Sequence, residues 1–205
     1  MNPKPLVSDT SGEPAASPCN ACVASRSKRA SLKSMVGVAL ALGSGWRGAH
    51  AAEGPQVGDW LVDADDAEFK PIKATDIVLG AKQRIVVPFD TAAKKARDES
   101  RFNRLLLLKL DPASLNEKTK ARSEAGGGVL AYSAICTHQA CDVNAWRAKE
   151  QRLLCFCHLS QFEPADGATV VSGPAPRPLP SLPLQVDSDG RLAVAGEFSA
   201  PLGAI

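Results

Sequence analysis

Two short boxes of cysteine and histidine hold the residues of this chain that are best suited to chemistry. The first box is CTHQAC at residues 136–141, and the second is CFCHLS at residues 155–160. Each box offers one thiolate and one imidazole to a shared centre and has one further cysteine. Thiolate is a soft ligand and imidazole a borderline one, and both bind iron and zinc. The boxes therefore predict a metal centre held between two facing loops.

Structural zinc is the first alternative for this ligand set, because thiolate and imidazole also bind zinc in tetrahedral sites. Zinc fingers usually pair two cysteines in one segment with two histidines in another. Here each box contributes one ligand of each type. A disulfide with incidental histidines is the second alternative, but both histidines lie inside the cysteine boxes. The pattern favours two irons with two protein ligands each.

The two boxes resemble the C-x-H-x-x-C and C-x-C-H-x-S boxes of Rieske iron-sulfur proteins of the disulfide-containing class. This resemblance implies a 2Fe-2S cluster in which two histidines replace two cysteines on one iron. By the match, Cys136 and Cys155 are the ligands of one iron, and His138 and His158 are the ligands of the other.

The same resemblance assigns the remaining cysteines and a third segment. It implies a disulfide between Cys141 and Cys157 that ties the two cluster loops together. Residues 173–176, which begin with Gly173 and Pro174, match the proline-rich loop that covers the cluster in this family. Each proline fixes its own φ angle and so stiffens that loop.

An electron-transfer function follows from the resemblance. Neutral imidazole ligands leave the cluster less negative than thiolates do, so it accepts an electron more readily. Imidazoles that lose a proton on oxidation also couple electron transfer to proton transfer, which suits a quinol donor. We expect the small subunit or redox partner of an arsenite-oxidase-like oxidoreductase, working with a larger subunit or a cytochrome. The alternative is the Rieske subunit of a quinol-cytochrome c reductase complex.

Several residues near the expected ligands differ from the usual family pattern. Ser160 matches the serine whose hydroxyl hydrogen-bonds a bridging sulfide and raises the potential. Phe162 replaces its usual tyrosine companion, Phe156 replaces a proline, Leu159 replaces a glycine, and Gln139-Ala140 replaces a Leu-Gly pair. Leu159 and Phe162 favour the arsenite-oxidase type. The missing tyrosine predicts a lower reduction potential than in members that have both hydroxyl groups.

The N-terminal residues 1–51 are expected to be an export signal. Residues 27–33, SKRASLK, resemble a twin-arginine signal in its Lys-Arg variant. An apolar stretch from Met35 to Trp46 follows, and then a small-x-small cleavage pattern that ends at Ala51. We expect export of the folded protein to the periplasm, where a disulfide persists. The alternative is a retained membrane anchor, although the stretch is shorter than the roughly 20 residues of a spanning helix.

Histidine and charge counts exclude other classes of protein. The chain has 3 histidines, and His50 lies in the expected signal. No histidine is left for the second iron site of a Rieske oxygenase, which needs two histidines and a carboxylate. The leader holds six of the 24 basic residues and two of the 22 acidic ones. The mature domain, residues 52–205, is therefore slightly acidic, and nothing in it points to nucleic acid, whose binding proteins carry a basic patch or stripe. We interpret Cys19-x-x-Cys22, in the leader, as incidental.

Strands are expected to position the boxes. Turn residues separate short apolar or β-favouring runs at 56–61, 84–89, 105–110, 129–135, 152–155, 169–172, 182–186 and 191–195. This spacing predicts an all-β domain, a sandwich or barrel of antiparallel strands. Asp189-Gly190 is typical of a hairpin turn. The resemblance adds that this is the Rieske fold, with a cluster-binding subdomain, about 129–179, inserted between the strands of a base.

Segments outside these runs give further expectations. Residues 91–104 are charged and lack proline and glycine, which predicts a short surface helix. Residues 116–128 are polar and end in three glycines, which is typical of a mobile loop. The resemblance implies an exposed histidine-bearing tip, for which Leu159, Gln139 and Pro174 could form an apolar docking rim. Packing of Leu159 against the disulfide is the alternative. The tail, residues 196–205, resembles tails that lie against a large partner subunit in arsenite oxidase.

Overall fold

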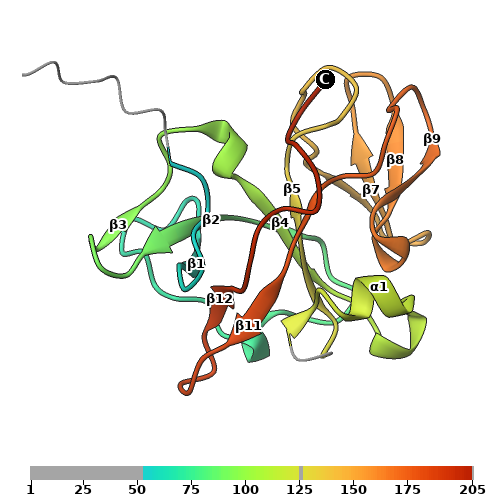
Figure 1. Ribbon diagram of the computed structural model, residues 1–205. Helices are drawn as coiled ribbons and strands as arrows, with labels where there is room; N and C mark the ends of the chain where they lie inside the picture. The colour runs from blue at the N-terminus through green and yellow to red at the C-terminus, as the bar shows by residue number, and fades with distance from the viewer. Residues whose placement is uncertain (1–52, 125–126, 205) are drawn as a thin grey trace, which may run out of the picture. The chain divides into compact units, whose positions relative to one another are not determined.

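The computed structural model describes residues 53–124 and 127–204, and most of their regular structure is antiparallel β-sheet (Figure 1). The expected export signal, its cleavage site and the Cys19-Cys22 pair lie outside these residues. The strands are β1 Trp60–Asp63, β2 Arg84–Asp90, β3 Lys95–Ala96, β4 Leu105–Lys109, β5 Val129–Ser133, β6 Ala145–Arg147, β7 Arg152–Cys155, β8 Ser160–Glu163, β9 Thr169–Ser172, β10 Ser181–Leu182, β11 Leu184–Val186 and β12 Leu192–Val194.

The larger sheet forms the base of the domain. Its strand order is β10-β5-β4-β2-β1-β12-β11, and β3 pairs with β2. The two ends of this order, β10 and β11, are separated in the chain by Pro183 alone. Proline has no N–H to donate to a strand partner, so it breaks the run 182–186 that the sequence predicts as one strand. The sheet therefore curves until its two end strands are consecutive in the chain, which makes it nearly closed.

Strand β4 is apolar on both faces because the base sheet has a core on each side. Side chains alternate between the two faces of a strand. Leu105 and Leu107 belong to one buried cluster, and Leu106 and Leu108 belong to another. All four leucines are at most 1% exposed. The continuous run of leucines is thus explained by burial on both sides rather than by a helix.

A smaller sheet supplies the second layer. Its order is β6-β7-β8-β9, and it is inserted in the chain between β5 and β10. Leu153 of β7 and Phe162 of β8 are fully buried and share a cluster with Leu106 and Tyr132 of the base. This shared cluster packs the two sheets together. The predicted all-β, antiparallel fold class is confirmed.

Residues 91–104 do not form the predicted surface helix. The carboxylate of Asp90 accepts hydrogen bonds from the backbone N–H groups of Ala92 and Ala93, which starts a turn. The chain then forms β3, and Arg97 pairs with the buried Asp59. A short 3-10 helix, η2, spans Arg101–Asn103. A side chain that hydrogen-bonds the nearby backbone competes with helix formation. In residues 91–104 these hydrogen bonds form in place of the helix.

The expected loop at residues 116–128 contains a short helix, α1, at Glu117–Lys120. Its N-cap is Asn116, whose side-chain oxygen accepts from the N–H of Thr119 at 2.7 Å. The buried carboxyl of Glu124 accepts from the N–H of Val129, and burial raises the pKa of Glu124. The expectation of a loop is wrong for Glu117–Lys120 alone, where the Asn116 cap supports a helical turn.

The predicted hairpin turn at Asp189-Gly190 is confirmed. Strands β11 and β12 pair directly on either side of it. The carboxylate of Asp187 accepts from the N–H groups of Asp189 and Arg191, and Gly190 adopts a φ of 82° that glycine tolerates best. Among the described residues there is no helix whose length and apolar character would let it cross a membrane.

Candidate iron-sulfur cluster site

Three loops at one end of the smaller sheet bring the predicted site residues together. The first box follows β5, the second box joins β7 to β8, and the proline-rich loop follows β9. Cys155 ends β7 and pairs in register with Ser160, which begins β8. The second box is therefore a tight turn whose two ends are fixed by strand pairing. Residues 156–159 protrude from the sheet at this turn, and each of them is exposed.

Two thiols lie buried beneath this turn. Cys136 and Cys155 are each 1% exposed and have no disulfide partner. Burial raises the pKa of the Cys155 thiol; the backbone N–H groups of Cys157 and His158 oppose the rise, and the adjacent Cys136 adds to it. Two thiols that influence each other in this way are close neighbours. A metal ion at this place would deprotonate them and satisfy both.

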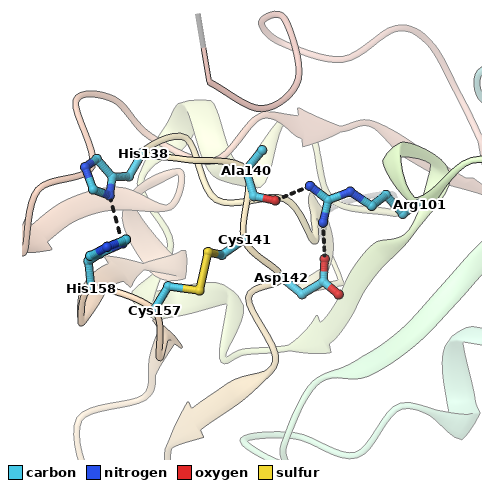
Figure 2. The surroundings of a disulfide bond; sticks show 7 residues. All are labelled: Arg101, His138, Ala140, Cys141, Asp142, Cys157 and His158. Carbon is cyan, nitrogen blue, oxygen red and sulfur yellow. Dashed lines mark hydrogen bonds and ion pairs between the residues drawn. A yellow bond between two sulfur atoms is a disulfide. The ribbon is translucent and has the colours of Figure 1, made fainter.

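Two imidazoles lie above the thiols at the surface. The Nδ1 atoms of His138 and His158 are 3.2 Å apart, and the two rings are perpendicular (Figure 2). His158 is exposed and His138 is half-buried. Both rings therefore direct the same nitrogen toward one point and leave the other nitrogen for contacts elsewhere.

A disulfide joins the two boxes. Cys141 and Cys157 are bonded, with Cα atoms 6.5 Å apart and a sequence separation of 16 (Figure 2). The predicted pairing is thus present in the structure. The sulfur of Cys155 lies within 4.8 Å of both bridged sulfurs. Because Cys141 and Cys157 are consumed by their own bond, this triplet is not a separate metal site.

The proline-rich loop closes the third side of the site. Gly173 has a φ of 90°, and a Cβ atom placed on it would lie 2.5 Å from the Cα of Ser160. Only glycine fits at this approach. The N–H of Ala175 donates to the buried hydroxyl oxygen of Ser160 at 3.1 Å. Because Ser160 accepts this bond through a lone pair, its own hydroxyl proton stays available for another acceptor.

Comparison with known proteins identifies the family. Residues 109–183 match the model of the Rieske [2Fe-2S] domain. The cytochrome bc1 complex Rieske iron-sulfur subunit of Streptomyces lividans is 32% identical over 148 residues, which cover 71% of this chain and 85% of that protein. The chain belongs to the Rieske iron-sulfur protein family.

Other Rieske relatives are matched over smaller parts of their length. The corresponding subunit of Streptomyces coelicolor is also 32% identical over 148 residues, but the match covers 41% of it. The putative respiratory nitrate reductase subunit Rieske of Haloferax mediterranei is 46% identical over 76 residues, which cover 37% of this chain and 34% of that protein. The structure of the soluble domain of Rieske protein II from Sulfolobus acidocaldarius aligns with a TM-score of 0.40 at 27% identity, over 50% of this chain and 65% of that one.

The donor set of this Rieske protein fits a 2Fe-2S cluster. Two buried free thiols belong to one cluster of side chains, two imidazole nitrogens from the same boxes converge, and a buried hydroxyl keeps a proton to donate. A Rieske-type cluster uses two thiolates on one iron and two imidazoles on the other. The protein is accordingly a Rieske iron-sulfur electron-transfer protein.

Two departures from the family pattern occur at residues with left-handed backbone conformation. Leu159 and Ala140 occupy positions where glycine is usual, and they have φ angles of 59° and 56°. A residue with a Cβ atom in this left-handed region costs about 1–2 kcal/mol. The usual glycines are thus explained by backbone conformation, and this chain tolerates strain at both loops.

The rim of the tip is exposed and partly apolar. Leu159 is 60% exposed, so it does not pack away against the disulfide. Gln139 and Pro174 are also exposed. Sequence reasoning did not place Phe156 on this rim, although it is 65% exposed beside the second box. Its position between two cysteines was the available signal.

Arg101 hydrogen-bonds two residues at the end of the first box. Its guanidinium donates to the backbone carbonyl of Ala140 and to Asp142, at 3.2 Å in the second case (Figure 2). Arg101 lies in η2, far from the boxes in sequence. No local pattern pointed to this contact, because it depends on how the base and the first box meet.

The C-terminal tail packs on this chain itself. Gly203 is buried, and a Cβ atom on it would lie 3.0 Å from the ring of Phe102 and 3.7 Å from the side chains of Ile135 and Ala140. Gly203 thus contacts η2 and the first box. The expectation that residues 196–205 lie against a large partner subunit stays a prediction.

Proposed function

We propose that this protein is the Rieske subunit of a quinol-oxidising, cytochrome bc-type complex. The observation that carries the proposal is the convergence of two imidazoles, with Nδ1 atoms 3.2 Å apart, from the same two boxes that supply two buried free thiols. The Streptomyces lividans relative, named as a bc1 subunit, is matched over 85% of its length and supports this assignment over the arsenite-oxidase type.

In this proposal Cys136 and Cys155 bind one iron, and His138 and His158 bind the other. Ser160 donates to a bridging sulfide, while Gly173 and Pro174 shield the cluster from the side. When bound, such a cluster takes up and releases one electron at a potential that its imidazole ligands raise. These roles are supported by burial of the two thiols and exposure of the imidazole edges.

The histidines have a second task in quinol oxidation. Because both Nδ1 atoms face the shared point, Nε2 of each ring is the nitrogen that remains for a proton. In this proposal, Nε2 of the exposed His158 accepts a hydrogen bond from a quinol hydroxyl. It takes up the proton of that hydroxyl when the quinol gives up an electron. Phe156 and Leu159 flank His158 and offer apolar surface to a quinol ring or to the wall of a quinol pocket.

The proposed place of action is the periplasm, after export by a twin-arginine-type signal in residues 1–51. The disulfide between Cys141 and Cys157 supports an oxidising compartment, since such bonds are rare in the cytosol. The proposed electron acceptor is a cytochrome of the same complex. A retained leader would place the protein at the membrane.

The test begins with the cluster and continues with turnover. The reduced, full-length protein is expected to give an electron paramagnetic resonance signal with the low average g value of histidine ligation. His138→Ala and His158→Ala are each expected to abolish that signal, and Gln139→Ala is the control. Membranes of a strain lacking this protein should lose quinol-cytochrome c reductase activity and regain it with the wild-type chain only. Retained signal in both histidine variants would contradict the ligand set.

A second candidate is the small subunit of a periplasmic, arsenite-oxidase-like oxidoreductase. The 46% identity to a putative nitrate reductase Rieske subunit and the presence of Phe162 support it. Purification of the native protein distinguishes the two, because a molybdenum-containing large subunit should accompany it in this case. If that subunit is found and reductase activity is unaffected by deletion, the first proposal fails.

Phe162→Tyr tests how this site is tuned. Phe162 is fully buried in the cluster of side chains that includes Cys136 and Cys155. Restoring the phenol hydroxyl is expected to raise the midpoint potential in voltammetry, because an added hydrogen bond to cluster sulfur stabilises the reduced state. An unchanged or lowered midpoint contradicts this account of the low potential.

A further inference from the structure

Arg177, in the proline-rich loop, contacts two other segments of the site. Its backbone carbonyl accepts from the hydroxyl of Thr137 at 2.7 Å, and its Nη2 donates to the carbonyl of Gly203 at 2.5 Å. Thr137 lies between Cys136 and His138, the two candidate ligands of the first box. One residue therefore links the covering loop, the first box and the C-terminal tail.

The guanidinium of Arg177 is linked to the first box through Gly203. Its bonding partner Gly203 lies against Ile135 and Ala140, the residues just before Cys136 and just before Cys141. The backbone of Arg177 thus bonds the first box directly through Thr137, and its guanidinium is linked to the same loop through Gly203. The proline residues on either side, Pro176 and Pro178, restrict the backbone further.

Arg177 is a half-buried residue whose guanidinium is largely inaccessible, and no carboxylate of the described residues forms an ion pair with it. Its Nε and Nη1 atoms are inaccessible, and neither has a hydrogen-bond partner among residues 53–124 and 127–204. The ion pairs of the described residues involve other arginines: Arg84, Arg97, Arg101, Arg147, Arg152 and Arg191. Arg152 of the smaller sheet, for example, pairs with Glu163 at 3.4 Å.

A buried cation interacts more strongly with a nearby charge than an exposed one, because water screens it less. Reduction adds one negative charge to a cluster, so an adjacent cation without a carboxylate favours the reduced state. We propose that Arg177 is a positioning residue that raises the reduction potential of the cluster by holding a largely inaccessible guanidinium, without a carboxylate partner among the described residues, near the first box. This inference rests on the proposed ligand assignment.

Voltammetry of the cluster-loaded, full-length protein tests the proposal. Arg177→Gln is expected to lower the midpoint potential, while Arg177→Lys, which keeps the charge, stays near the wild-type value. The matched control is Arg152→Gln, which removes one positive charge from the same part of the fold where a carboxylate neutralises it. That control is expected to leave the midpoint near wild type. Added salt should reduce the Arg177→Gln shift little, since the Nε and Nη1 atoms of Arg177 are inaccessible to solvent.

A chain truncated after Leu202 separates charge from anchoring. It loses the Gly203 carbonyl but keeps Arg177, so its midpoint is expected to stay above that of Arg177→Gln. The proposal is overturned if Arg177→Gln matches wild type, or if Arg177→Lys or the truncation falls as far as Arg177→Gln. Arg177→Met serves as a second neutral variant. Loss of the chromophore in both neutral variants, with retention in Arg177→Lys, also overturns it, because the role is then assembly.

The outcome is distinguishable from failure of the proposed function. If the wild-type signal lacks the g values of histidine ligation, the ligand assignment fails and Arg177 is not at issue. If the wild-type signal is as expected and the Arg177 variants leave the midpoint unchanged, only the present inference fails.

Discussion

The base sheet and the cluster tip of this molecule are held together in different ways. The base has a leucine strand, β4, that is buried on both faces, so removal of apolar surface from water stabilises it. The tip keeps His158, Phe156 and Leu159 exposed and gains little from burial. Specific links between its loops replace burial: one disulfide and the hydrogen bonds of Thr137 and Ser160. An electron carrier needs such a tip, because its redox centre has to approach a partner.

The largest effect on the tip alone is expected from Gly173→Ala. The new Cβ atom would lie 2.5 Å from the Cα of Ser160, so the covering loop has to move away from the second box. We expect loss of most of the visible chromophore with an unchanged far-ultraviolet circular dichroism spectrum. Gly190→Ala is the matched control, since Gly190 also has positive φ but nothing within 4 Å of its Cβ position. Equal chromophore content in both variants would remove the distinction between the two regions.

Leu107→Ala is the corresponding change in the base. Leu107 is fully buried in β4, and leucine-to-alanine changes in cores cost about 2–5 kcal/mol. We expect about 3 kcal/mol less stability in chemical denaturation, with normal cluster signals in the molecules that remain folded. Val186→Ala, at a position 38% exposed, is expected to cost much less. A similar loss in the two variants would argue against burial as the source of stability.

The paired change Cys141→Ser with Cys157→Ser tests the covalent link of the tip. A disulfide that closes a loop of this size contributes about 3 kcal/mol in the chain-entropy model. We expect the chromophore to be lost at lower denaturant concentration, well before the far-ultraviolet signal of the base. Wild-type protein treated with a thiol reductant should behave in the same way. Simultaneous loss of both signals would mean that the tip and the base unfold as one unit.

Leu159→Gly is expected to have the smallest effect and the opposite sign. Leu159 has a φ of 59°, and glycine removes this strain at the cost of a more flexible unfolded chain. We expect a net gain of about 0.5–1 kcal/mol, measured as a higher melting temperature of the visible circular dichroism signal. Ala140→Gly, at a φ of 56°, should give a gain in the same direction. A lower melting temperature would show that the leucine side chain itself supports the loop.

Many strands were predictable from the sequence, because a buried strand requires a local run of apolar or β-favouring residues. The runs at 84–89 and 105–110 correspond closely to β2 and β4 of the base, and the run at 152–155 corresponds to β7 of the smaller sheet. Strand β8 was missed although it alternates between buried and half-buried residues, because its first residue, Ser160, was assigned to the box. Residues 91–104 were mistaken for a helix because the competing partners of Asp90 and Arg97 are not visible in composition.

At the site, the sequence identified residue types but not the contacts that orient them. The resemblance of the two boxes to the Rieske motifs predicted a cluster and the Cys141–Cys157 pairing, which the structure contains. The roles of Arg101 and Arg177 were not predictable, since each depends on segments distant in the chain. Contacts between distant segments produce no periodic pattern in the sequence. A loop arginine that is solvated cannot be told from a buried one by its neighbours in the chain.

The point where the smaller sheet leaves and rejoins the base has a consequence for engineering. Ser181 of β10 pairs with Tyr132 of β5, and the N–H of Ser133 donates to the carbonyl of Pro180 at 2.8 Å. The stretch from 134 to 180 thus starts and finishes at adjacent points on two neighbouring strands. Such a stretch has the geometry of a cassette, which another protein with an antiparallel strand pair can accept in place of its own connecting loop.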